Sequence, residues 1–212
     1  MGSVDRPFRH LARAWAEAQI RDRAEAHYPG SRALARIRST HFLGPLLRRG
    51  VVSDIEVALF DAQVSAGDAL LRLRRLTIEL HEVTIGRADL WRGRVRLKSL
   101  GTGRVEVEIE GASVAKAVGL PIVFHDDEVE IRAGVGLLAV SARGALSIDD
   151  DVVKFRPGRL QGVPLLVSMD FEIPIPTSPL LPRAADVRSV EGGLVLTCDL
   201  DGVPPGLIAP AR

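Results

Sequence analysis

From residue 31 onward, apolar and polar side chains alternate with a period of two, and this pattern limits the possible folds more than any other feature. In 104–110, for example, Val105, Val107 and Ile109 alternate with arginine and glutamates. Such alternation is typical of antiparallel strands with one buried and one solvated face. We therefore predict an α+β, mostly β fold based on a long, highly curved antiparallel sheet.

Further stretches repeat this pattern or carry short apolar runs, and several are longer than an ordinary strand. Glycines within and between them are expected to let the sheet coil. Gly101-Thr102-Gly103 predicts a hairpin turn, and short helices are predicted at 41–49 and at 113–118, the second closed by Gly119. The predicted strands are 54–65, 71–85, 94–100, 104–110, 122–124, 129–133, 137–142, 145–148, 152–155, 165–173 and 194–200.

Residues 7–27 predict an amphipathic helix, which Pro29-Gly30 ends. Its apolar face includes Leu11 and Trp15, and Arg13, Glu17 and Arg21 follow at intervals of four. Two interpretations stay open: the helix docks on the rest of the protein, or it lies on an anionic membrane with Trp15 at the interface. We expect this helix to occupy residues 1–30 and a single curved-sheet domain to occupy 31–212.

Composition excludes several classes of protein. The chain of 212 residues has 28 basic and 27 acidic residues, which argues against a nucleic-acid partner. The single Cys198 excludes an intrachain disulfide framework and a Cys-rich zinc site. Aromatic residues make up only 4%, so the core must be aliphatic. Residues 1–30 lack the apolar core of a signal peptide, and the longest apolar runs are too short to span a membrane.

No arrangement of residues predicts catalysis, a metal site or a cofactor. Ser113 and Lys116 have the S-x-x-K spacing of penicillin-recognising enzymes, but the partner motifs S-D-N and K-T-G are absent. The acidic runs 125–128 and 149–151 lack the spacing of a metal site and are expected to be solvated turns. We therefore predict a protein that is not an enzyme. A lipid hydrolase using Ser113 is the weakest alternative.

Four segments resemble the LmeA-like phospholipid-binding proteins of actinobacterial envelopes, and together they cover about residues 30–200. The resemblance implies a tubular lipid-binding fold, in which a coiled antiparallel sheet wraps around a helix and encloses an apolar tunnel for lipid tails. It supplies no catalytic residues. The segments are 37–50 with the strand 55–64, then 73–83, then 107–120, and finally 181–196.

The resemblance and the aliphatic strands together predict a phospholipid carrier or sensor in envelope lipid or glycolipid metabolism. The alternative is a structural or scaffolding module whose core its own side chains fill. The expected tail-binding residues are aliphatic and lie on the predicted strands: Ile55, Val57, Leu59, Leu71, Leu73, Ile78, Leu80, Val107, Ile109, Leu194 and Leu196. The expected head-group ligands are arginines beside apolar runs: Arg48, Arg49, Arg72, Arg74 and Arg75.

The expected partners are therefore a phospholipid and, through residues 7–27, a membrane surface, with no nucleic acid. The resemblance implies a location in the cell envelope, whereas the absence of a signal peptide within residues 1–30 keeps a cytoplasmic or membrane-peripheral location open. The sequence leaves the lipid class and the oligomeric state open.

Overall fold

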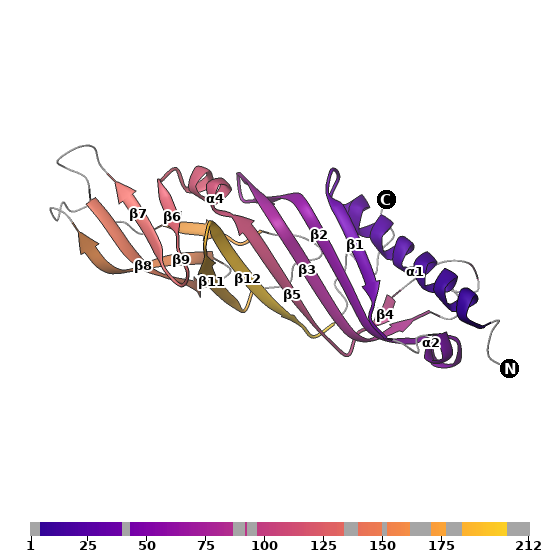
Figure 1. The fold of residues 1–212 in the computed structure, drawn as a ribbon. Helices are drawn as coiled ribbons and strands as arrows, with labels where there is room; N and C mark the ends of the chain where they lie inside the picture. The colour runs from indigo at the N-terminus through magenta and orange to yellow at the C-terminus, as the bar shows by residue number, and fades with distance from the viewer. Residues whose placement is uncertain are drawn as a thin grey trace. The chain divides into compact units, whose positions relative to one another are not determined.

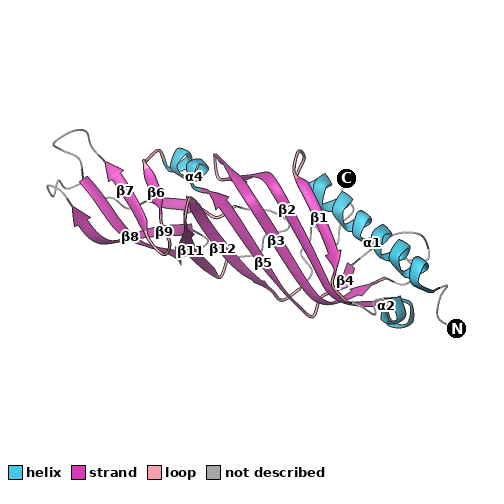
Figure 2. Ribbon diagram, viewed as in Figure 1, coloured by secondary structure: helices cyan, strands magenta, loops and turns pink. Residues whose placement is uncertain are grey.

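A computed structural model describes residues 5–39, 43–86, 92, 97–133, 140–149, 152–161, 171–176 and 184–202. Strands dominate it and helices are few (Figure 2), which confirms the predicted α+β, mostly β class. The helices are α1 (Asp5–His27), α2 (Leu43–Arg49) and α4 (Gly111–Val118). The strands are β1 (Arg32–Ile37), β2 (Val51–Ala66), β3 (Ala69–Ile85), β4 (Leu97–Ser99), β5 (Thr102–Glu110), β6 (Ile122–Phe124), β7 (Val129–Ala133), β8 (Val140–Asp149), β9 (Val152–Gln161), β10 (Glu172–Pro174), β11 (Asp186–Val190) and β12 (Gly193–Leu200).

The strands form two antiparallel sheets (Figure 1). A seven-stranded sheet has the order β1-β2-β3-β5-β12-β11, with β4 also paired to β3. A five-stranded sheet has the order β10-β9-β8-β7-β6. Parts of the predicted strands 94–100, 137–142 and 165–173 and of the predicted helix 41–49 lie outside the described residues.

The chain divides into two compact units, which are described in turn. The first comprises residues 1–62, 76–105 and 199–212, and the second comprises residues 63–75 and 106–198.

In the first unit, α1 lies along the edge strand β1 (Figure 1) and supplies hydrogen-bond partners to its open edge. The amide of Ile37 donates to Glu17 Oε1 at 2.9 Å, and the amide of Ala33 donates to Glu25 Oε1 at 2.9 Å. The two glutamates are about 12 Å apart along a helix and the two amides about 13 Å apart along a strand, so the spacings match. This docking of α1 agrees with the first of the two interpretations of residues 7–27.

The first unit also shows how the long strands bend. Within β2 and β3 the residues with positive φ are Asp61 (57°) and Glu82 (53°), and neither is a glycine. Burial changes phase at both places, as expected where a bulge adds a residue to one strand. Gly67 and Gly192 instead take positive φ in the β2–β3 and β11–β12 turns. The expectation that glycines would bend the strands is therefore wrong for these two bends.

The hairpin turn predicted at Gly101-Thr102-Gly103 is also wrong. Ser99 of β4 pairs with Thr84 of β3, and the Gly101 amide then donates to the carbonyl of His81 at 3.2 Å. The chain therefore continues along β3 from β4 into β5 without reversing. A Cβ atom at Gly103 would lie 2.8 Å from the Glu79 carbonyl oxygen, so this glycine allows close approach of two backbones.

In the second unit, the five-stranded sheet has one apolar face, which includes the buried Val129, Ile131, Ala142 and Val153. The rings of Phe155 and Phe171 stack there with centroids 5.3 Å apart. Helix α4 ends at Gly119, whose φ of 73° is left-handed, as predicted from the sequence. Strand β12 lies between β5 and β11 and is buried on both faces over most of its length.

The opposite face of the five-stranded sheet carries a buried carboxylate. The side chain of Glu130 is only 7% exposed. It accepts a hydrogen bond from Arg132 Nε at 2.7 Å and two from Arg143, Nε at 3.2 Å and Nη2 at 3.0 Å. The hydrogen bond from Arg132, followed by the remaining arginine interactions, holds the pKa of Glu130 below its usual value despite burial. Glu130 is therefore ionised and fixes both guanidinium groups.

Replacing Glu17 and Glu25 by alanine should release the edge of β1. We expect the double variant to lose about 3–6 kcal/mol of local stability, because each hydrogen bond to a charged group contributes about 1.5–3 kcal/mol. Hydrogen exchange should show faster exchange at the Ala33 and Ile37 amides. Asp22→Ala is the matched control, since Asp22 is an exposed acid of the same helix. Unchanged protection of both amides in the double variant would contradict the role given to the glutamates.

Candidate functional site

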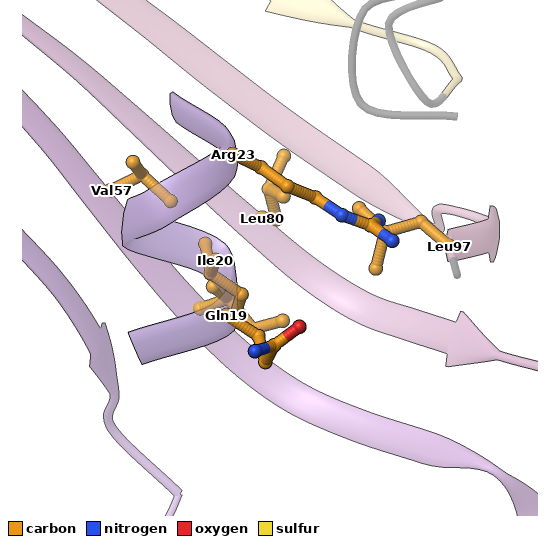
Figure 3. Close-up of a pocket in the computed structure, with 7 residues that line it drawn as sticks. Gln19, Ile20, Arg23, Val57, Leu80 and Leu97 are labelled. Carbon is orange, nitrogen blue, oxygen red and sulfur yellow. The ribbon is translucent and has the colours of Figure 1, made fainter. Parts of the chain in front are cut away.

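The first unit contains an apolar cavity beneath α1 (Figure 3). Its volume is about 20 Å³, which is room for a single water-sized molecule. Five aliphatic side chains supply most of the wall, with Gln19 and Arg23 of α1 adding polar groups. The aliphatic side chains that line it from the sheet are Ile55 and Val57 of β2, Leu80 of β3 and Leu97 of β4, and Ile20 joins them from α1.

The periodicities of helix and strand explain how these side chains meet. Residues 19, 20 and 23 lie within one turn of α1, so they share one side of the helix. Ile55 and Val57 are two residues apart in β2 and therefore point to the same face of the sheet. The alternation that predicts the strands thus also produces the aliphatic floor of the cavity.

Arg23 is the distinctive residue of this site. Figure 3 shows its side chain extended from α1 past Leu80 toward Leu97. Burial among these apolar groups lowers the pKa of Arg23 from its ordinary value, since desolvation disfavours the charged form. Within the described part of the chain, no carboxylate forms an ion pair or a hydrogen bond with it. Arg23 therefore combines a positive charge and partial burial, with no carboxylate partner among the residues that the structure describes.

The second unit contains another cavity, of about 180 Å³. It lies at the β2–β3 turn and is lined there by Ala66, Asp68, Ala69 and Leu71, while Ala117 and Val118 of α4 and Glu172 and Ile173 of β10 complete the wall. The two carboxylates make this cavity more polar than the one beneath α1. Glu172 is also 3.7 Å from Lys154 Nζ, so part of its charge is already balanced.

All eleven sequence-predicted tail-binding residues are buried, and four of them line one of these two cavities. Ile55, Val57 and Leu80 line the cavity beneath α1, and Leu71 lines the cavity at the β2–β3 turn. The other seven are buried residues that line neither of these cavities: Leu59, Leu73, Ile78, Val107, Ile109, Leu194 and Leu196. Their burial is also what a filled core requires, so their role toward a lipid stays a prediction.

The five sequence-predicted head-group arginines lie at the surface, and none of them lines either cavity. Arg48 and Arg49 are exposed at the end of α2, and Arg72, Arg74 and Arg75 are exposed on β3. Arg74 Nη1 lies 3.6 Å from Glu108, and Arg72 Nε lies 3.9 Å from Glu110. Sequence reasoning missed Arg23, because its position in the helical pattern resembles that of any solvated arginine.

The remaining sequence motifs have structural roles. The Ser113 hydroxyl donates to the Glu110 carbonyl at 2.7 Å and accepts from the Arg72 amide at 3.1 Å. Asp126 accepts from the Glu191 amide at 3.2 Å and so ties the β6–β7 turn to the β11–β12 turn. Cys198 is buried in β12, as predicted. No described helix is both long and apolar enough to cross a bilayer.

Comparison with known proteins identifies one family. Residues 4–199 match the family model described as LmeA-like phospholipid-binding. The match covers nearly the whole chain and confirms the resemblance that the four sequence segments indicate. No curated protein sequence and no solved structure matches the chain.

Replacing Arg23 by leucine should stabilise the protein while it carries no ligand. Leucine removes the desolvated charge and adds apolar surface to an apolar wall, so we expect a gain of about 1 kcal/mol in the free energy of unfolding. Chemical denaturation measures this gain. Arg21→Leu on the exposed side of α1 is the matched control and should bring no gain. A clear loss of stability in Arg23→Leu would show that Arg23 is structural.

Proposed function

Because the chain belongs to the LmeA-like phospholipid-binding family, we propose that it binds a phospholipid beneath α1. In this proposal the acyl tail lies against the aliphatic wall formed by Ile20, Ile55, Val57, Leu80 and Leu97, and the phosphate binds Arg23. The protein acts without catalysis, as a carrier or sensor in envelope lipid or glycolipid metabolism.

The observation that carries this proposal is the partly buried Arg23 in a mostly aliphatic wall, to which Gln19 adds the other polar group. A guanidinium group in such surroundings is costly unless an anion joins it. Phosphate suits it well, because two parallel N–H groups of arginine can bind two phosphate oxygens. A phosphate placed next to an aliphatic wall is the arrangement found in a phospholipid.

The energetics of transfer explain why the head group must decide specificity. Removing an acyl chain from water is worth about 0.8 kcal/mol per CH₂, but a bilayer offers nearly the same gain. Exchange of the tail between membrane and protein is therefore close to neutral. A charged contact with the phosphate can add binding free energy that the tail does not supply, and it can therefore select between lipids.

A cavity of about 20 Å³ is too small for an acyl chain, so binding requires α1 to move away from β2 and β3. Glu17 and Glu25 attach the helix to the β1 edge through polar hydrogen bonds and not through an apolar interface. This kind of attachment suits a helix that moves away from β2 and β3. Its connection to β1 passes through Gly30, which has a φ of 85°. A tail entering beneath α1 would replace contacts between the helix and the sheet.

The small cavity also favours a second candidate function, that of a scaffold with a self-filled core. The large aliphatic residues of the first unit, such as Leu59, Leu76 and Ile78, are fully buried. A scaffold would use its outer surfaces to bind a partner protein and would take up no lipid. The two functions therefore differ in whether the purified protein contains lipid.

The outward side of α1 supports contact with a membrane surface through residues 7–27. Leu11 is 71% exposed and Trp15 is 41% exposed, and they lie one helical turn apart. Their exposure is compatible with the docking of α1, because Ala16 and Ala24 are the buried residues of the helix. Tryptophan favours the interface between lipid and water. We include this contact in the proposal as the way in which the protein reaches its lipid.

Native mass spectrometry should show the purified protein carrying a phospholipid, or taking one up from anionic vesicles. Ile20→Trp should reduce uptake at least tenfold, because the larger ring occupies the space of the tail. Arg23→Leu should take up less of zwitterionic and anionic phospholipids alike, since both carry the phosphate that Arg23 binds in this proposal. Ala26→Trp is the matched control at an exposed position of α1 and should retain uptake. A lipid-free mass under all these conditions would favour the scaffold.

Replacing Leu11 and Trp15 by alanine should weaken association with vesicles without changing the fold. The two side chains together should contribute about 2–4 kcal/mol at an interface, so we expect at least a tenfold lower partition coefficient. Vesicle flotation measures this coefficient, and circular dichroism checks the fold. Ala14→Ser and Ala26→Ser, at exposed alanines of the same helix, serve as controls. Equal flotation of the double variant and the wild type would refute the contact.

A further inference from the structure

The cavity at the β2–β3 turn is a second site, which the proposed function does not use. Its volume is about 180 Å³, and the residues that line it all belong to the second unit. An apolar cavity of about 150 Å³ inside a protein can hold a molecule of the size of benzene. By the same measure, this cavity has room for a ligand of about six or seven non-hydrogen atoms.

Aliphatic side chains make up most of the wall of this cavity. Leu71 of β3 and Ile173 of β10 are buried, and Ala117 and Val118 come from the last turn of α4. Each CH₂ group of a ligand that leaves water for such a wall strengthens binding about fourfold. The wall therefore favours a ligand with an alkyl part.

The two charged residues in the wall are both acidic, Asp68 of the turn and Glu172 of β10. Among the described residues, no ion pair or hydrogen bond joins the side chain of Asp68. An anion in the cavity would meet two negative charges. A neutral apolar ligand would displace water from the carboxylates and give them no hydrogen bond in return. The wall therefore selects a ligand that carries a positive charge.

The cations near the cavity leave this charge largely in place. Lys154 Nζ lies 3.7 Å from Glu172, but it is closer, at 2.9 Å, to Asp149, which also interacts with Arg156. Lys116 is exposed on α4 and is not one of the residues that line the cavity. A ligand inside the cavity therefore touches the two carboxylates and no cationic side chain of the described residues.

The open edge of β10 adds a backbone acceptor. Consecutive side chains of a strand point to opposite faces, so a cavity lined by both Glu172 and Ile173 reaches the edge of the strand. The Phe155 amide donates to the Phe171 carbonyl at 3.3 Å, and hydrogen-bonded pairs alternate with pairs that are not hydrogen-bonded. The next pair, Lys154 with Glu172, is therefore of the second kind. Its Glu172 carbonyl points away from β9, to the open edge.

We propose that this cavity binds a primary ammonium group on a short alkyl chain. The alkyl part lies against Leu71, Val118 and Ile173, and the ammonium group donates its three N–H bonds to Asp68, to the Glu172 carboxylate and to the Glu172 carbonyl. A quaternary ammonium group fits less well, because proteins hold such groups in aromatic cages and no described aromatic residue lines this cavity.

A primary ammonium group on a short alkyl chain occurs in soluble amines and in the head groups of aminophospholipids. The lipid source rests on the proposed function, whereas the site itself does not.

The test is an NMR titration of the whole chain with n-pentylamine. We expect the amide signals of Asp68, Ala69 and Val118 to shift and to saturate at millimolar amine, as is usual for so small a ligand. 1-Pentanol and pentanoate have the same chain without the positive charge, and they should bind about tenfold more weakly or less. Equal binding of 1-pentanol would overturn the proposal, and so would the absence of any shift with pentylamine.

Two variants with matched controls test the wall. Asp68→Asn removes the charge and keeps a residue suited to a turn, so it should bind pentylamine about tenfold more weakly. Asp186→Asn, at an exposed acid of β11, is its control. Ala117→Leu narrows the cavity and should also weaken binding, whereas Ala112→Leu, at an exposed alanine of the same helix outside the wall, should not. Equal losses in a variant and its control would overturn the proposal.

A third variant is expected to change binding in the opposite direction. Lys154→Gln removes the cation that competes with the ligand for Glu172, so it should bind pentylamine severalfold more tightly. A general loss of structure would weaken binding instead, and weaker binding of Lys154→Gln would count against the proposal.

Soluble dihexanoyl phospholipids distinguish the two sources of the amine. Displacement of pentylamine by the phosphatidylethanolamine alone would identify a lipid head group, and displacement by neither lipid would identify a soluble amine; both results agree with the proposal. Equal displacement by the phosphatidylcholine would contradict it. Ile20→Trp, which should block lipid uptake beneath α1, should leave pentylamine binding unchanged, so this inference and the proposed function can fail separately.

Discussion

The first unit depends on covering the open edge of β1. An edge strand exposes unpaired backbone groups that would otherwise pair with another chain. Here the cover is a helix, and the glutamates at 17 and 25 act as hydrogen-bond acceptors for two strand amides. Because Glu17 and Glu25 attach the helix to this edge, the residues of α1 next to them can stay over the sheet. The small cavity beneath α1 is lined by residues of this helix and of β2, β3 and β4.

The most reliable part of the sequence analysis was the alternation of apolar and polar residues. It predicted the strands of 54–65, 71–85 and 104–110 within a few residues of their observed ends. It did so because alternation reports directly which face of a strand is buried. The bends at Asp61 and Glu82 escaped prediction, since a bulge depends on the partner strand and not on the bulged residue alone. The glycines at 101 and 103 led to the wrong prediction of a hairpin turn for a related reason, because a glycine can mark either a turn or a close contact between two backbones.

The candidate site was harder to predict from sequence than the fold. Its aliphatic floor follows from the strand pattern, so Ile55, Val57 and Leu80 were among the expected residues. The burial of its polar residue, Arg23, depends on how α1 docks, and no local sequence pattern predicts that docking. An arginine in a helix is usually solvated, and among the arginines that the structure describes Arg23 is set apart by burial that lowers its pKa. The family match strengthens the lipid assignment but does not choose between the residues.

The position of β12 has a consequence for how the protein acquires its fold. This strand is hydrogen-bonded between β5 and β11, and both of its faces are buried, yet it lies far from β5 along the chain. Pairing between distant segments slows folding, because a long loop must close before the contacts form. During synthesis, the apolar residues of β5 stay uncovered until β12 has left the ribosome. The nascent chain is therefore an expected client of chaperones.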